Sequence, residues 1–268
     1  MPKIRERDAG LRSDNPVGRD FSEALARGLA VMTVFGPDSR AMTLSAIARE
    51  VDLPKATVRR TLLTLIHLGY MEEEGRLFSL RPTILRLASS YLGADPVSTI
   101  FQPVCERLAR ELGVTCSVAV LDAEEAVMIA YASPRRVHAH GTMEGIGLRL
   151  PAFCTAVGRI LLAGRSPAER AAFLAALDAR AITPYTVTDK DRLRQLWVQA
   201  ESDGYALVDQ EAEIGFRSIA VPVRRRDGRL IAALNVGLRV EHANCQEMRD
   251  ISLPRLLAEV ADLKEQLL

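Results

Sequence analysis

Apolar residues recur with the helical period of about 3.6 in three segments near the start of the chain, and each segment predicts a helix. The first runs from Phe21 to Phe35 and stops at the Gly-Pro-Asp sequence 36–38, because proline lacks the N–H that a continuing helix needs. The second follows Thr43, a residue type that caps helix N-termini. The third runs from Pro54 to Leu68, with proline in the first turn, where it is tolerated. A short second helix joined by a tight turn to a longer third one is typical of a helix-turn-helix.

A β-hairpin and a connecting helix follow the three helices. Two short segments, 70–73 and 77–80, lie on either side of a Glu-Gly-Arg turn and predict a β-hairpin, the wing. The segment from Pro82 to Leu92 is apolar on about half of its circumference and ends at a Gly-Ala-Asp-Pro sequence. The predicted organisation is a disordered arm (1–20), a winged helix-turn-helix domain (21–81), a linker helix (82–95) and an effector-binding domain (96–268).

The outer face of the third helix carries the chemistry of a DNA-reading element. Arg59 and Arg60 can chelate guanine edges in the major groove, and Lys55 and Thr57 lie at the helix N-terminus, where phosphate is favoured. A basic helix face alone is more often solvated surface, but three helices followed by a hairpin with a basic tip favour DNA binding. We therefore expect contacts to double-stranded operator DNA from Thr43, Ser45, Lys55, Ala56, Thr57, Arg59, Arg60, Thr64 and Arg76.

The remainder of the chain alternates predicted helices and strands. Helices are expected at 97–112, 158–163, 167–177, 188–203 and 246–268, and strands at 116–121, 127–131, 137–141, 218–224 and 230–238. Thr188, with Asp191 three positions later, is the expected N-cap of the fourth of these helices. An Asp-Gly pair within 225–229 predicts a hairpin between the last two strands. The fold class is therefore α+β, with a GAF- or PAS-like cup as the second domain.

Composition and charge limit the functional classes. Apolar residues make up 48% of the 268 residues, enough for two cores, and no apolar stretch is long enough to span a membrane. The N-terminus lacks the apolar segment of a signal peptide, and the four cysteines are scattered, which favours a cytoplasmic protein. Residues 1–93 hold 14 Lys and Arg against 11 Asp and Glu, and the rest holds 21 against 23. This asymmetry only weakly supports a DNA-binding first half.

Two alternative functions need a chemistry that the sequence does not supply. An enzyme would use Cys154, Cys116 or Ser218 as nucleophile, with His67, His138, His140 or His242 as base, but no catalytic motif joins these residues. His138 and His140 could both point to one side of a strand and bind a metal, yet a third ligand is not evident, so no metal or cofactor is expected. A DNA-organising protein would need a higher positive charge than the net +1 of this chain.

Several stretches resemble the IclR family of bacterial regulators. In the first half these are 39–49 and 53–70, and in the second half 147–151, 155–163, 204–211, 215–223 and 233–236. Within the family, Ala-Thr-Val-Arg-Arg at 56–60 and Val-Asp-Gln-Glu at 208–211 look most like regulators of β-ketoadipate pathway genes, which respond to protocatechuate, 4-hydroxybenzoate or β-ketoadipate.

The resemblance implies a homodimer or a tetramer on a pseudo-palindromic operator, an aromatic or keto acid effector in the second domain, and activation of aromatic catabolism. The effector residues carried over by motif, together with two that could shape an aromatic slot, are Arg149, Phe153, Thr155, Ala156, Val157, Asp209, Ser218, Asn235 and Gly237. Met143 could also line this slot, and Met143, Phe153 and Arg149 could equally be core packing. Gly237 departs from the serine that many relatives keep, so a wider pocket with one donor fewer is expected. The linker helix would transmit effector binding to the DNA-binding half.

Overall fold

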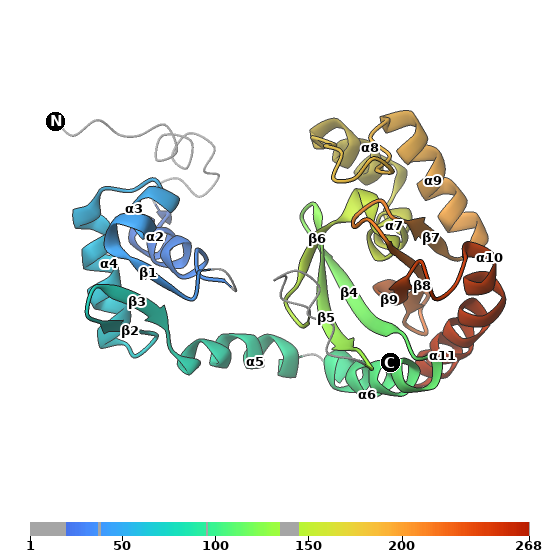
Figure 1. Cartoon of the computed structure of the whole chain (residues 1–268), viewed down its shortest axis with the longest axis horizontal. Helices are drawn as coiled ribbons and strands as arrows, with labels where there is room; N and C mark the ends of the chain where they lie inside the picture. The colour runs from blue at the N-terminus through green and yellow to red at the C-terminus, as the bar shows by residue number, and fades with distance from the viewer. Residues whose placement is uncertain (1–19, 37–38, 95, 135–144, 268) are drawn as a thin grey trace. The chain divides into compact units, whose positions relative to one another are not determined.

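The computed structural model describes residues 20–36, 39–94, 96–134 and 145–267. The chain forms two compact units, the first ending at Tyr91 and the second beginning at Leu92 (Figure 1). This boundary lies inside the linker helix predicted at 82–95. The predicted arm, except for Asp20, and the predicted strand at 137–141 lie outside the described residues.

The first unit contains the three predicted helices, α2 (Glu23–Met32), α3 (Leu44–Glu50) and α4 (Lys55–His67). The predicted cap Thr43 is confirmed, since its hydroxyl accepts the Ala46 N–H at 3.2 Å. The helices share an apolar core, which includes Val31, Ile47, Val58, Leu62 and Phe78. The second and third helices with the tight turn between them therefore form the expected helix-turn-helix.

The wing is a three-stranded sheet with the order β1-β3-β2. The predicted hairpin consists of β2 (Met71–Glu74) and β3 (Leu77–Leu80), and Gly75 at its turn has a φ of +62°, which favours glycine. The additional strand β1 (Ala41–Thr43) pairs antiparallel with β3. Its three residues are too short to give a periodic pattern, so the sequence did not predict it.

The connecting segment is a short 3₁₀ turn, η2 (Pro82–Ile84), followed by α5 (Leu85–Ala94). Every residue from Leu85 to Tyr91 is exposed. A helix of ten residues is marginally stable in water without packing against another surface. None of the residues that the structure describes therefore covers this stretch of the helix.

The second unit contains a six-stranded antiparallel sheet with the order β6-β5-β4-β9-β8-β7. Its strands are β4 (Thr115–Asp122), β5 (Glu125–Ala132), β6 (Arg149–Pro151), β7 (Ala206–Asp209), β8 (Phe216–Arg224) and β9 (Leu230–Arg239). The edge strands β6 and β7 were not predicted, because three or four residues carry little pattern. The predicted hairpin of β8 and β9 is confirmed.

Helices cover both faces of this sheet (Figure 1). On one face lie α6 (Pro96–Leu112) and α11 (Leu253–Gln266), and on the other lie α7 (Ala156–Ala163), α8 (Pro167–Ala176) and α9 (Lys190–Asp203). We call the face under α7 the cup face. Between the sheet and each helix layer lies an apolar core, so the α+β prediction is confirmed.

Two helix ends differ from the predictions. The N-cap of α9 is Asp189, whose carboxylate accepts the Arg192 N–H at 2.7 Å, so Thr188 lies one residue too early. The final helix is interrupted, since α10 (Cys245–Glu247) and a π turn, η4 (Met248–Ser252), precede α11. Within the parts of the chain that the structure describes, no helix is long and apolar enough to cross a membrane.

Candidate functional site

The outer face of α4 is the candidate DNA-reading surface. Val58, Leu62 and Leu65 bury one stripe of this helix in the core. The opposite stripe lines an open hollow of about 530 Å³, formed by Ala56, Arg59, Arg60, Leu63, Thr64 and His67. Four of these six residues were predicted to contact DNA, whereas Leu63 and His67 were not. The Thr64 hydroxyl donates to the Arg60 carbonyl at 3.0 Å, which leaves its oxygen available only as an acceptor.

The other predicted DNA residues lie in the same unit. Ser45 is exposed in the first turn of α3, and Lys55 is exposed in the first turn of α4. Thr57 is half-buried, and Arg76 is exposed at the turn of the wing. The Thr43 hydroxyl is already engaged in capping. Contacts of all these residues to DNA remain predictions.

The cup face brings together three of the predicted effector residues. Side chains alternate between the faces of a strand, and the strand register places Asn235 opposite Ser117 and Ala220. In the next row on the same face, Gly237 lies opposite Thr115 and Ser218. Helix α7 packs across this face, where its first residues Ala156 and Val157 join a core with Ala220 and Ala233. Ser218, Asn235 and Gly237 therefore share one face with the start of α7.

Asn235 carries an unusual buried polar atom. Asn235 is only 7% exposed, and its amide Nδ2 donates to the Ser117 hydroxyl at 3.3 Å. Its Oδ1 is buried and has no hydrogen-bond partner among the described residues. Leaving such an acceptor unpaired costs about 1–3 kcal/mol. A buried acceptor on the cup face is suited to a ligand that brings an O–H or N–H donor.

The start of α7 supplies hydrogen-bond donors next to this face. Thr155 caps the helix, since its hydroxyl accepts the Gly158 N–H and donates to the Pro151 carbonyl, both at 3.2 Å. The N–H groups of Ala156 and Val157, the first two in the helix, have no acceptor within it. Backbone N–H groups at a helix N-terminus favour an anion, and a carboxylate is one such group.

Two predicted effector residues are engaged elsewhere. Asp209 lies opposite Arg217, on the sheet face away from Ser218, and its carboxylate accepts from the Arg217 Nε at 3.1 Å. Arg149 lies in β6 and forms ion pairs with Glu125 at 2.6 Å and Asp122 at 2.7 Å. The expectation that these side chains join the cup is therefore not met. Phe153 is buried in the core around α7, which matches the packing alternative.

The prediction of a wider pocket at Gly237 is wrong. A Cβ atom at this position would lie 2.3 Å from Cζ of Phe216. The phenyl ring therefore lies directly over the Gly237 backbone and occupies the space that a serine side chain would take. The sequence showed only that the serine hydroxyl is missing at position 237. It could not show the contact with Phe216, because the two residues lie on different strands.

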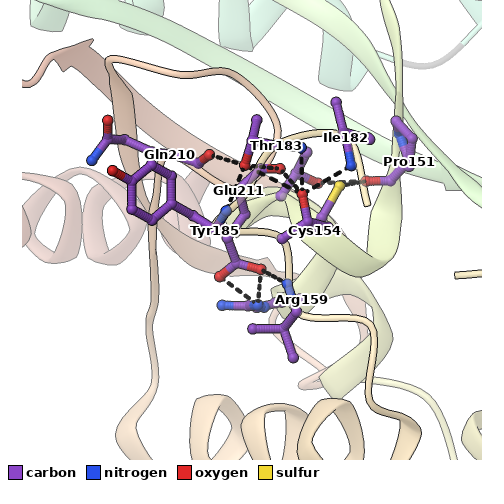
Figure 2. A network of polar contacts seen from close by, with 11 residues as sticks. Pro151, Cys154, Arg159, Ile182, Thr183, Tyr185, Gln210 and Glu211 are labelled. Carbon is purple, nitrogen blue, oxygen red and sulfur yellow. Dashed lines mark hydrogen bonds and ion pairs between the residues drawn. The ribbon is translucent and has the colours of Figure 1, made fainter. Parts of the chain in front are cut away.

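A buried ion pair fixes α7 to the loop after β7 (Figure 2). Arg159 donates to both carboxylate oxygens of Glu211 at 2.7 and 2.8 Å, and the two residues are 3% and 7% exposed. The Val187 N–H also donates to Glu211, and the hydroxyls of Thr183 and Thr186 donate to the carbonyls of Gln210 and Glu211 at 2.7 Å. The sequence analysis missed this network, although one arginine inside the apolar helix 156–163 was a visible signal.

Cys154 and Cys116, the two candidate nucleophiles among the cysteines, do not have the chemistry of nucleophiles. Burial, together with the charge of Glu211, raises the pKa of the Cys154 thiol to about 12. A hydrogen bond with Cys105 and burial raise the pKa of Cys116 well above its usual range. A thiol attacks as the thiolate, and both groups stay protonated near neutral pH. Within the described ranges there is also no group of three His, Cys, Asp or Glu residues that could hold a metal ion.

A helix-turn-helix unit joined to a separate α+β unit is the organisation of a ligand-responsive transcriptional regulator. The family model "IclR helix-turn-helix domain" matches residues 24–75, and "Bacterial transcriptional regulator IclR C-terminal" matches residues 89–265. The chain belongs to the IclR family. The resemblance seen in the sequence is thereby confirmed, and the relatives are regulators rather than enzymes.

Individual relatives agree with the family assignment. The Pca regulon regulatory protein of Pseudomonas putida is 39% identical over 249 residues, which cover 92% of this chain and 85% of that protein. A transcriptional regulator from Rhodococcus sp. RHA1 is 36% identical with a TM-score of 0.81, covering 92% of this chain and 98% of that one. An IclR homologue from Microbacterium hydrocarbonoxydans, solved with 4-hydroxybenzoate, is 28% identical with a TM-score of 0.76, covering 89% and 96%.

Proposed function

We propose that this regulator controls genes of aromatic acid catabolism and that its effector is a hydroxylated aromatic acid. The observation that carries the proposal is the buried Asn235 Oδ1 on the cup face, an acceptor that a ligand hydroxyl can satisfy. The solved relative with bound 4-hydroxybenzoate supports the same ligand class. The regulator would act in the cytoplasm, where its operator DNA is found.

The two ends of such a ligand suit two different parts of the cup. Its carboxylate would accept from the N–H groups of Ala156 and Val157 at the start of α7. Its hydroxyl would donate to Asn235 Oδ1. A keto acid, the alternative effector, offers a carbonyl at that end, which is an acceptor and cannot pair with Oδ1. The arrangement therefore favours a hydroxybenzoate over β-ketoadipate.

Asn235→Leu tests this assignment. The wild-type chain is expected to bind 4-hydroxybenzoate about three- to tenfold more tightly than benzoate, the range of one hydrogen bond. The variant should lose that preference, because leucine offers no acceptor, while its basal operator affinity stays unchanged. Calorimetry with benzoate, 4-hydroxybenzoate and β-ketoadipate measures the affinities, and benzoate is the internal control. A variant that keeps the preference contradicts the pairing, and a wild-type chain that binds no aromatic acid contradicts the effector class.

We further propose that the chain works as a homodimer through α5 and α2. Leu87 and Tyr91 are 50% and 61% exposed and lie four residues apart, on one face of α5. Leu25 and Leu29 of α2 are likewise exposed at 64% and 48%. A second copy would cover α5, which is too short to be stable alone. Effector binding would then act through its different affinities for two arrangements of the dimer.

Leu87→Glu tests the dimer surface. Placing a charge in an apolar interface is expected to convert the dimer to monomer at micromolar concentration, because the charge would have to lose its water. The control Ser89→Glu adds the same charge to the opposite side of the helix and should leave the mass unchanged. Sedimentation equilibrium gives the mass, and a dimer that survives Leu87→Glu excludes this surface.

A further inference from the structure

Leu63 is an exposed apolar residue in the middle of α4, the candidate DNA-reading helix. It is 47% exposed, and it lies five residues after Val58 and one after Leu62, on the side of α4 opposite the buried stripe. Rotating α4 about its axis could not bring Leu63 into the core of this unit while Leu62 and Leu65 remain buried. Its exposure is therefore a property of the outer face and does not result from incomplete packing.

The surroundings of Leu63 combine apolar surface with positive charge. Leu63 lines the hollow of about 530 Å³ together with Ala56, the other apolar residue of its lining. Arg59 and Arg60 lie one helical turn before Leu63, and His67 lies one turn after it. An apolar surface bordered by two guanidinium groups is suited to a polyanion that also presents an apolar group.

Duplex DNA meets both requirements at two neighbouring bases. In the major groove only thymine presents a methyl group, whereas guanine presents the two acceptors that an arginine can chelate. We propose that Leu63 contacts the 5-methyl group of a thymine that neighbours a guanine read by Arg59 or Arg60. This inference rests on α4 being the reading helix. It identifies Leu63 as a residue that determines operator specificity.

Deoxyuridine substitution tests the contact, because uracil differs from thymine only by the missing methyl group. The full chain first selects its preferred duplex from a random pool, and each thymine is then replaced singly. Fluorescence anisotropy is expected to show a loss of about fourfold for the contacted methyl, the effect of one buried methyl-sized group. Leu63→Ala should bind the original duplex more weakly, and its affinity should not change when uracil replaces that thymine.

Leu68→Ala is the matched control. Leu68 is 57% exposed at the end of α4 but is not part of the hollow. This variant should keep the full sensitivity to uracil. The proposal is overturned if no single uracil weakens wild-type binding, or if Leu63→Ala remains sensitive at the same position. A chain that selects no duplex contradicts the reading helix itself as well as the methyl contact.

Discussion

An Arg159→Met variant is expected to lose about 3–5 kcal/mol of the free energy of unfolding of the C-terminal unit. Glu211 would then keep a buried negative charge without its partner, since the residue is only 7% exposed and Arg159 contacts both of its oxygens. Replacing both residues by methionine should recover most of the loss, because no buried charge is then left without a partner. The buried pair thus fixes α7, on which the cup depends.

Trp197 offers a direct measurement of this effect. It is the only tryptophan of the chain, it is fully buried in α9, and it reports on the C-terminal unit alone. Its fluorescence during urea unfolding gives the free energy. The control Arg165→Met breaks an exposed pair with Glu169 and should cost less than about 1 kcal/mol. Equal effects of Arg159→Met and Arg165→Met would contradict the account of the buried pair.

The double variant Arg59→Ala/Arg60→Ala is expected to lose operator affinity by about two orders of magnitude or more, because each arginine that chelates a base contributes roughly 1–3 kcal/mol. Both side chains are exposed on the outer face of α4, so the fold should not change. Effector affinity should also stay unchanged, because the two arginines belong to the first unit and the cup to the second. Anisotropy with operator DNA and calorimetry with the effector measure the two activities.

The matched control removes the same charge from the second unit. Arg165→Ala/Arg229→Ala takes away two exposed arginines and is expected to leave operator affinity unchanged. A similar loss in both double variants would mean that net charge, rather than base reading, sets the affinity. Loss of effector binding along with DNA binding in Arg59→Ala/Arg60→Ala would contradict two separable functions.

The parts of the fold that sequence predicted are those with local signals. Helices α2, α3 and α4 follow from periodic apolar residues, the Thr43 cap from its residue type, and the hairpin of β8 and β9 from an Asp-Gly turn. Strands β1, β6 and β7 have only three or four residues each and form because longer strands pair with them. Their existence depends on contacts distant in the chain, which a local pattern does not contain.

The same distinction applies to the candidate site. The motif reading named Asn235 and the start of α7, but only the three-dimensional structure shows that they share one sheet face and that Asn235 Oδ1 is unpaired. The partners Arg159 and Glu211 are 52 residues apart, and no local pattern links them. Asp209 carried the right motif, yet strand alternation turns its carboxylate to the other face, where Arg217 binds it. Sequence motifs therefore named the segments of the candidate site, whereas strand register decides which of their side chains lie on the cup face.

The central claim is that an effector in the second unit alters DNA binding by the first. The most direct test titrates the full chain against its fluorescently labelled operator with and without saturating 4-hydroxybenzoate. The account predicts that operator affinity changes by a factor of about five to 150, the usual range of allosteric coupling, and that operator DNA changes 4-hydroxybenzoate affinity by the same factor. If 4-hydroxybenzoate binds and operator affinity stays the same, the effector does not regulate DNA binding and the account is wrong.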